Sequence, residues 1–126
     1  MKRVNFVVLF ACFIGISGAF SVLFGAWLAH AGVNYSQAVQ FRLETALNYQ
    51  FIHTLALFAC LVWFQQQQSN SKLIALFLFS TGILFFSGTL YVKTFFDDSL
   101  IGNFTPIGGI ILALAWLQLA VAGIRK

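Results

Sequence analysis

The sequence predicts an all-α integral membrane protein folded as a four-helix bundle. Hydrophobic residues make up 60% of the 126 residues and charged residues only 8%, whereas soluble domains contain about 45–50% apolar and about 25% charged residues. Four apolar runs, at about 4–29, 45–64, 73–92 and 104–124, each reach the roughly 20 residues that cross a bilayer as a helix. These runs lack the strict alternation of apolar and polar residues found in a membrane β-barrel. Structures other than helices and closed barrels leave backbone groups unpaired in lipid, so helices remain. We therefore expect one membrane domain over residues 1–126.

The first run, residues 4–29, contains no charged residue. Its beginning also resembles a signal peptide, because Lys2 and Arg3 precede it and residues 9–12 resemble a lipoprotein cleavage site. Two observations argue against processing: the apolar segment before Cys12 is short, and the apolar run continues far beyond Cys12. We therefore expect a retained membrane helix.

The connections between the runs differ in character. Residues 36–48 interleave apolar and polar side chains, and Ser36 is a typical residue to cap the start of a helix. We expect an interfacial helix in this stretch, near the outer membrane surface, that runs into the second span. Residues 65–72 are expected to form a polar turn and residues 97–103 a loop. Pro106 falls in the first turn of the fourth helix, where proline is tolerated best.

The charges of the connections predict that the amino and carboxyl termini are cytoplasmic. In a four-span protein, both termini and the turn at 65–72 lie on the same side of the membrane. That side carries no acidic residue, and its basic residues are Lys2, Arg3, Lys72, Arg125 and Lys126. The charged residues of the other side are Arg42, Lys93, Glu44, Asp97 and Asp98. Because short loops rich in Lys and Arg stay in the cytoplasm, we expect a multi-pass protein of the bacterial plasma membrane, surrounded by lipid.

Small residues recur at helical spacing within the spans. Association of helices in lipid depends on close backbone approach, so small residues are typical of helix contacts. The residues predicted to pack helices together are Gly18, Ser21, Gly25, Gly88, Gly108 and Gly109.

Composition and motifs exclude several classes of function. Seven basic and three acidic residues give a net charge of +4, and the basic residues are scattered along the chain, so no nucleic-acid partner is expected. The sequence contains no nucleophile elbow, zinc-protease motif or glycine-rich phosphate loop. We therefore expect no enzyme, no catalytic residue, no metal site and no cofactor.

Four segments match a known pattern in order and spacing. They read FGAWLAH at 24–30, FRLETALNYQFIHTLALF at 41–58, FFSGTLYV at 85–92 and TPIGGIILALAWL at 105–117. Together they resemble a bacterial membrane family known as domain of unknown function 423, or uncharacterised protein family 0382. A small eukaryotic transmembrane protein is similar. The resemblance implies a four-helix inner-membrane protein, but it brings no reaction, ligand or cofactor.

Polar side chains of the spans are predicted to gather toward the outer end of the bundle. The residues of this hypothetical cluster are His30, Glu44, Tyr49, Gln50, His53, Ser87 and Tyr91. Ionisable groups inside a membrane are costly and often functional, so the cluster is a candidate ligand site. The alternative is structural: tyrosines anchor at the interface, and a neutral histidine hydrogen-bonds to a neighbouring helix.

Three functions remain open from the residues alone. The first is a structural or accessory membrane protein in which the polar cluster holds helices together, with a second copy or another membrane protein as partner. The second is a small-solute or proton transporter or channel subunit that acts as an oligomer. The third is a haem- or metal-binding protein that uses His30 and His53 as ligands. We expect the first, because it needs nothing beyond the residues present.

Overall fold

The structure, a computed structural model, describes residues 2–97 and 100–125 and is helical almost throughout these ranges. The α-helices are α1 (Lys2–Ala31), α2 (Gln37–Gln66), α3 (Asn70–Ile83), α4 (Thr89–Phe96) and α5 (Thr105–Ile124). A π-helical segment, η2 (Leu84–Gly88), joins α3 to α4 without a break, and the short 3₁₀ helices η1 (Gly32–Asn34) and η3 (Ile101–Phe104) lie in the connections. Four of the resulting helical stretches are long and apolar enough to cross a membrane, which confirms the predicted architecture.

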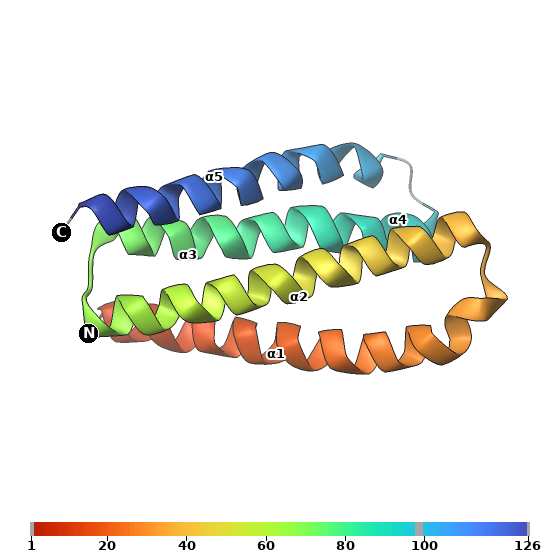
Figure 1. Cartoon of the computed structure of the whole chain (residues 1–126), viewed down its shortest axis with the longest axis horizontal. Helices are drawn as coiled ribbons and strands as arrows, with labels where there is room; N and C mark the ends of the chain where they lie inside the picture. The colour runs from red at the N-terminus through yellow and green to blue at the C-terminus, as the bar shows by residue number, and fades with distance from the viewer. Residues whose placement is uncertain (1, 98–99, 126) are drawn as a thin grey trace.

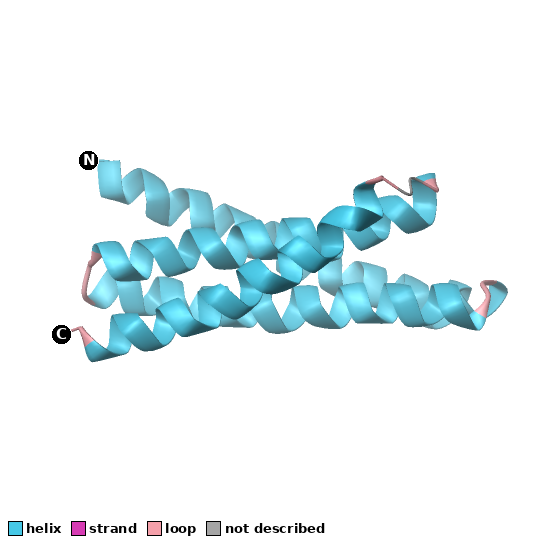
Figure 2. Cartoon of the chain, turned by 90° about the horizontal axis from the view of Figure 1, so that it is seen from above, coloured by secondary structure: helices cyan, strands magenta, loops and turns pink. Residues whose placement is uncertain are grey.

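The helices pack mainly on their neighbours along the chain. α2 lies between α1 and α3, and α5 packs on the other side of α3 (Figure 1). The start of α1, the end of α5 and the turn between α2 and α3 lie at one end of the bundle. Loops are confined to the two ends (Figure 2). Of the charges used to predict orientation, Asp98, Lys126 and the side chains of Lys2 and Arg3 lie outside the described part, and the cytoplasmic placement of the termini stays a prediction.

The expected helix before the second span is the first part of α2. Its start is fixed by Ser36, whose side chain accepts a hydrogen bond from the Val39 backbone N–H at 3.3 Å. The 30 residues of α2 span roughly 45 Å at about 1.5 Å per residue, more than the roughly 30 Å of a hydrocarbon core. Its ends therefore reach into the headgroup regions. Leu43 and Ala46 are fully buried, so this part of α2 already belongs to the bundle.

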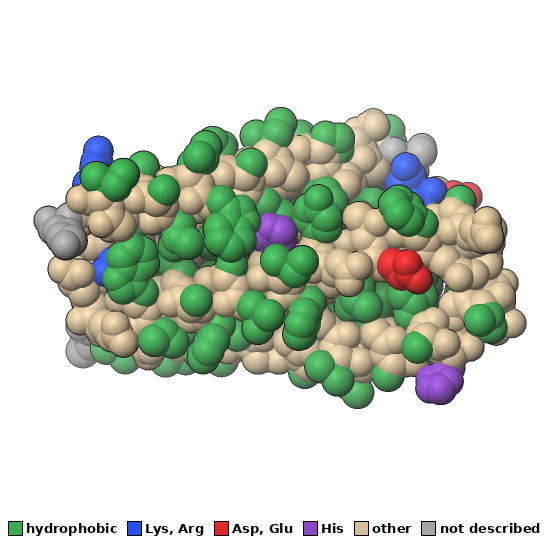
Figure 3. Space-filling view, in the orientation of Figure 1, with side chains coloured by type: hydrophobic (Ala, Val, Ile, Leu, Met, Phe, Trp, Pro, Cys, Tyr) green, Lys and Arg blue, Asp and Glu red, His purple; other side chains and the backbone are tan. Residues whose placement is uncertain are grey.

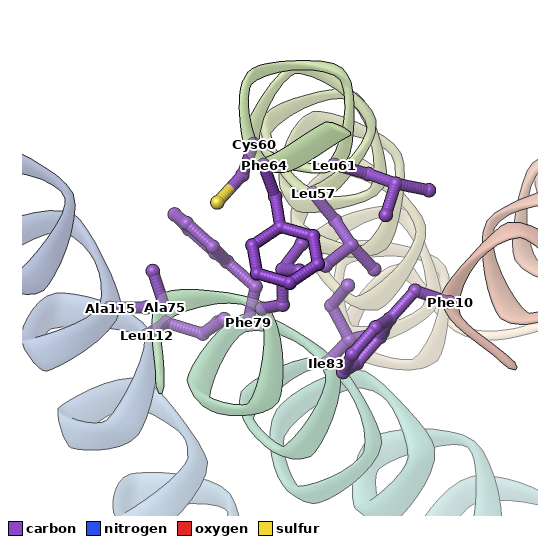
Figure 4. Close-up of a cluster of buried hydrophobic side chains, with 11 residues drawn as sticks. Phe10, Leu57, Cys60, Leu61, Phe64, Ala75, Phe79, Ile83, Leu112 and Ala115 are labelled. Carbon is purple, nitrogen blue, oxygen red and sulfur yellow. The ribbon is translucent and has the colours of Figure 1, made fainter. Parts of the chain in front are cut away.

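The main hydrophobic core lies toward the end that holds the termini. Side chains from α1, α2, α3 and α5 meet there (Figure 4). Leu57 and Phe64 of α2 and Phe79 of α3 are almost fully buried. Lys72 closes this end: its ammonium donates hydrogen bonds to the backbone oxygen (2.8 Å) and Oε1 (3.1 Å) of Gln67 and lies 4.3 Å from the ring centroid of Trp63.

The predicted packing residues fall into two groups in the structure. A Cβ at Gly108 would overlap the backbone of Phe85 and Phe86, so the close approach of α5 to η2 requires glycine at this position. A Cβ at Gly25 would lie 3.3 Å from Leu47 Cδ2. By contrast, a Cβ at Gly18 or Gly88 would meet no atom within 4 Å, so nothing in the described part requires glycine there for close packing.

The two remaining predicted packing residues are Gly109 and Ser21. A Cβ at Gly109 would lie 3.7 Å from a ring carbon of Phe86. Ser21 is buried, but its hydroxyl donates within α1, to the Ser17 backbone oxygen at 2.8 Å. Gly82 was not predicted as a packing residue, yet a Cβ there would collide with Leu112. Close contacts of α5 with the α3–η2 helix therefore involve glycine from both partners.

Candidate functional site

A network of polar side chains joins three helices in the middle of the bundle. The Ser17 and Thr54 hydroxyls lie 2.8 Å apart. The Gln50 amide donates to Ser17 Oγ at 3.0 Å and more weakly to the Ser17 backbone oxygen at 3.4 Å. The Tyr91 hydroxyl donates to Gln50 Oε1 at 2.8 Å. This central network of Ser17, Gln50, Thr54 and Tyr91 links α1, α2 and α4.

The positions of these residues along their helices explain the network. Gln50 and Thr54 are four residues apart and therefore share one face of α2. That face is turned to α1, where Ser17 is 6% exposed. Ser17 and Thr54 were not among the predicted site residues. The spacing of Ser17 and Ser21 could have indicated a polar helix face, because these residues are also four apart in an otherwise apolar part of the first span.

A cavity of about 270 Å³ adjoins the central network. Ser17, Gln50 and Tyr91 form part of its wall, and the rest is mostly apolar, with Phe13 of α1 and Ile83 of α3 among the lining residues. Because the amide and hydroxyl groups of the network already bond to one another, the cavity is suited to hydrocarbon.

The π-helical segment η2 supplies a further link between helices. Ser87 is 1% exposed, and its hydroxyl donates to the Ala46 backbone oxygen of α2 at 2.7 Å. Just beyond η2, the Thr89 and Thr105 hydroxyls lie 2.7 Å apart and join α4 to α5. Segments of π-helix occur often at functional sites, and here the segment lies where α5 comes closest to the α3–α4 helix.

His53 lies on another face of α2, between Gln50 and Thr54 in the sequence, and takes no part in the central network. Its Nδ1 is 2.6 Å from the Tyr49 backbone oxygen, and its ring contacts Tyr49, Phe79 and Trp116 at centroid distances of 5.6 to 6.3 Å. The side chain is 7% exposed. We define the His53 face as His53 together with Tyr49 and Trp116, which are both about two-fifths exposed.

The predicted outer cluster is therefore divided. Gln50 and Tyr91 are hydrogen-bonded, and Ser87 lines the same cavity. The other four members lie apart from that cavity: Tyr49 and His53 form their own pair, while Glu44 and His30 are exposed.

The two histidines do not form one site. On the face shown in Figure 3 they are well separated, and the charged side chains gather at the two ends. His30 is in the last turn of α1, whereas His53 lies 16 residues into α2 after Gln37, which is roughly 24 Å along the helix. Within residues 2–97 and 100–125 no group of three or more His, Cys, Asp or Glu side chains is placed to hold a metal ion.

Comparison with known proteins identifies the family. The family described as "Protein of unknown function (DUF423)" matches residues 24–109. The chain belongs to this family. The UPF0382 membrane protein of Haemophilus influenzae is 32% identical over 114 residues, which cover 90% of this chain and 91% of that protein. The UPF0382 inner membrane protein YgdD of Escherichia coli K12 is 32% identical over 122 residues, covering 96% and 91%.

A third relative is the UPF0382 membrane protein SSP2132 of Staphylococcus saprophyticus, 36% identical over 98 residues that cover 77% of this chain and 81% of that protein. No solved structure gives a significant match. The DUF423 match and the four apolar helices make this chain a multi-pass inner-membrane protein. Gln50, Thr54, His53 and Tyr91 lie within the matched segment, and Ser17 precedes it.

Proposed function

We propose that the protein is a non-enzymatic accessory protein of the plasma membrane that acts through lateral contact with another polypeptide inside the bilayer. The observation that carries the proposal is the hydrogen-bonding state of His53. A backbone oxygen only accepts hydrogen bonds, so the contact between Nδ1 and the Tyr49 oxygen requires the proton on Nδ1. In the neutral ring Nε2 is then an acceptor.

Nε2 of His53 has no hydrogen-bond partner within the described ranges, while every buried side-chain nitrogen and oxygen there has one. Nε2 is therefore not fully buried, and it lies near the middle of a 30-residue membrane helix. Hydrocarbon offers no donor, and an unmet polar group in that medium is costly. A donor from a second polypeptide would satisfy it, as polar residues do between membrane helices.

The proposal is tested by photo-cross-linking within the membrane. Ala113 is exposed and lies three residues from Trp116 on α5, so a photoreactive amino acid at this position samples the His53 face. We expect a cross-linked product whose yield falls when His53 is changed to leucine. An interhelical hydrogen bond contributes about 0.6 kcal/mol on average in membranes, so the association constant should fall about threefold.

The matched control places the same photoreactive amino acid at Val22, which is exposed on α1. Any product from this position should not respond to His53→Leu. The mass of the product identifies the partner as a second copy or a different protein, and both would support an accessory role. A yield from position 113 that His53→Leu leaves unchanged would exclude the proposed contact.

The two alternative functions, transport and haem or metal binding, both need more than one copy of the chain. For transport, the polar groups of the central network are bonded to one another and the adjoining cavity is mostly apolar, so a polar path would have to form between subunits. For haem or metal binding, the separation of His30 from His53 along the bundle means that one chain does not present both to one iron. Neither is favoured by a specific contact.

A further inference from the structure

A second cavity, of about 390 Å³, lies at the end of the bundle opposite the termini. It is formed where the beginnings of α2 and α5 meet η2 and α4. Arg42 and Thr45 of α2 and Thr105 of α5 supply its polar groups, and Phe86 and Leu90 are among its apolar ones. We call this cavity the Arg42 pocket.

Arg42 and Phe86 line the pocket at different depths. Arg42 is in the second turn of α2, so it lies near the membrane surface. Phe86 lies deeper, because its ring stacks on Tyr49, two helical turns further along α2, at a centroid distance of 4.2 Å. Near the headgroups the pocket offers the Arg42 cation beside Ala38 and Phe41, and nearer the hydrocarbon it is lined by Phe86, which matches the polarity of a phospholipid.

No described residue neutralises the positive charge of this pocket. Within the described ranges Arg42 forms no hydrogen bond or ion pair through its side chain, and Glu44, two residues further on, is exposed. The Thr45 hydroxyl also makes no hydrogen bond there. Lys93, the other basic residue at this end, packs against Gly102 instead of lining the pocket. One guanidinium and one hydroxyl are thus available to a ligand.

We propose that the Arg42 pocket binds one phospholipid of net negative charge. The guanidinium pairs with the phosphodiester, because its planar donors match phosphate oxygens, and the Thr45 hydroxyl donates to the same group. An acyl chain follows Leu90 and Phe86 toward the hydrocarbon. A single uncompensated positive charge matches a lipid whose only charge is its phosphate, whereas a zwitterionic headgroup brings an ammonium close to Arg42.

The test measures lipid binding to the purified full chain by native mass spectrometry. Delipidated protein in detergent is titrated with phosphatidylglycerol or phosphatidylcholine. The wild type should bind phosphatidylglycerol about fivefold more tightly, the effect of about 1 kcal/mol expected for one basic residue at a membrane surface. Arg42→Gln should remove this preference, and Lys93→Gln should keep it. Far-UV circular dichroism checks that both variants remain helical.

Two further measurements separate the pocket from general charge attraction. Leu90→Trp places a larger side chain in the apolar part and should reduce binding of phosphatidylglycerol without changing the charge. Glycerol 3-phosphate, which has the anion but no acyl chain, should not compete at the concentration of lipid that half-saturates the protein. The proposal is overturned if Lys93→Gln acts like Arg42→Gln, if Leu90→Trp has no effect, or if glycerol 3-phosphate competes as well as the lipid.

Discussion

Changing Gly108 to alanine is expected to lower the free energy of unfolding by about 3 kcal/mol, the upper part of the range for overpacked interiors. The added Cβ would overlap the Phe85 and Phe86 backbone. Backbone cannot rotate away as the end of a side chain can, so α5 must shift from η2. That shift would also weaken the contact between the Thr89 and Thr105 hydroxyls.

Gly18→Ala provides the control, since a Cβ at Gly18 meets no atom within 4 Å. Alanine is the better helix former by about 1 kcal/mol, so this change should leave stability unchanged or raise it slightly. Unfolding by sodium dodecyl sulfate in mixed micelles, followed by circular dichroism, measures both variants. Equal stability of the two proteins would show that α5 does not approach η2 as described.

Changing Gln50 to leucine is expected to lower the free energy of unfolding by about 2 kcal/mol, because three hydrogen bonds of about 0.6 kcal/mol each are lost. Two of these bonds run to Ser17 and one comes from Tyr91. Tyr91→Phe alone should cost about 0.6 kcal/mol. In the double variant the second change should cost less, since the Tyr91–Gln50 bond is already broken; this coupling measures the bond directly.

Ser80→Ala is the matched control for the central network. The Ser80 hydroxyl donates at 2.8 Å only within its own helix, to the Leu76 backbone oxygen, so its removal should change stability by less than either network variant. The same micelle unfolding experiment applies to all four proteins. Strict additivity of Gln50→Leu and Tyr91→Phe would contradict the bond between these residues.

The spans could be predicted because the physical requirement is local. A helix must be apolar over about 20 residues to cross a bilayer, and each run can be judged by itself. The cap at Ser36 was predictable for the same reason, since its bond to Val39 lies within one turn. The π-helical segment was not predicted, because residues 84–88 carry no proline or charge that marks it.

Packing partners across the bundle were harder to predict. In a soluble helix the polar face points to water, but here the lipid-facing and buried sides are both apolar, so periodicity does not reveal which side is buried. Ile16 and Ser17 are neighbours, yet only Ser17 faces α2. A small hydroxyl such as that of Ser17 or Thr54 leaves little trace in hydropathy, although it determines where α1 meets α2.

The predicted topology placed the polar residues at one end of the bundle, but it did not show toward which neighbouring helix each side chain is turned. Gln50 and His53 are three residues apart, but they bond in different directions, toward Ser17 and toward the Tyr49 backbone. His30 and Glu44 satisfy the same topological criterion and are exposed. A prediction of the site therefore needs the relative rotation and register of the helices, which a single sequence did not supply here.

A four-span bundle with both termini in the cytoplasm predicts a definite pattern of cysteine labelling, which is its most direct test. Single cysteines at Asn34, Gln66 and Asn103, all exposed, are introduced after Cys12 and Cys60 are changed to alanine. In spheroplasts, a membrane-impermeant maleimide should label positions 34 and 103 at once and position 66 only after permeabilisation. Immediate labelling of position 66 together with position 34 would contradict the bundle's arrangement across the membrane.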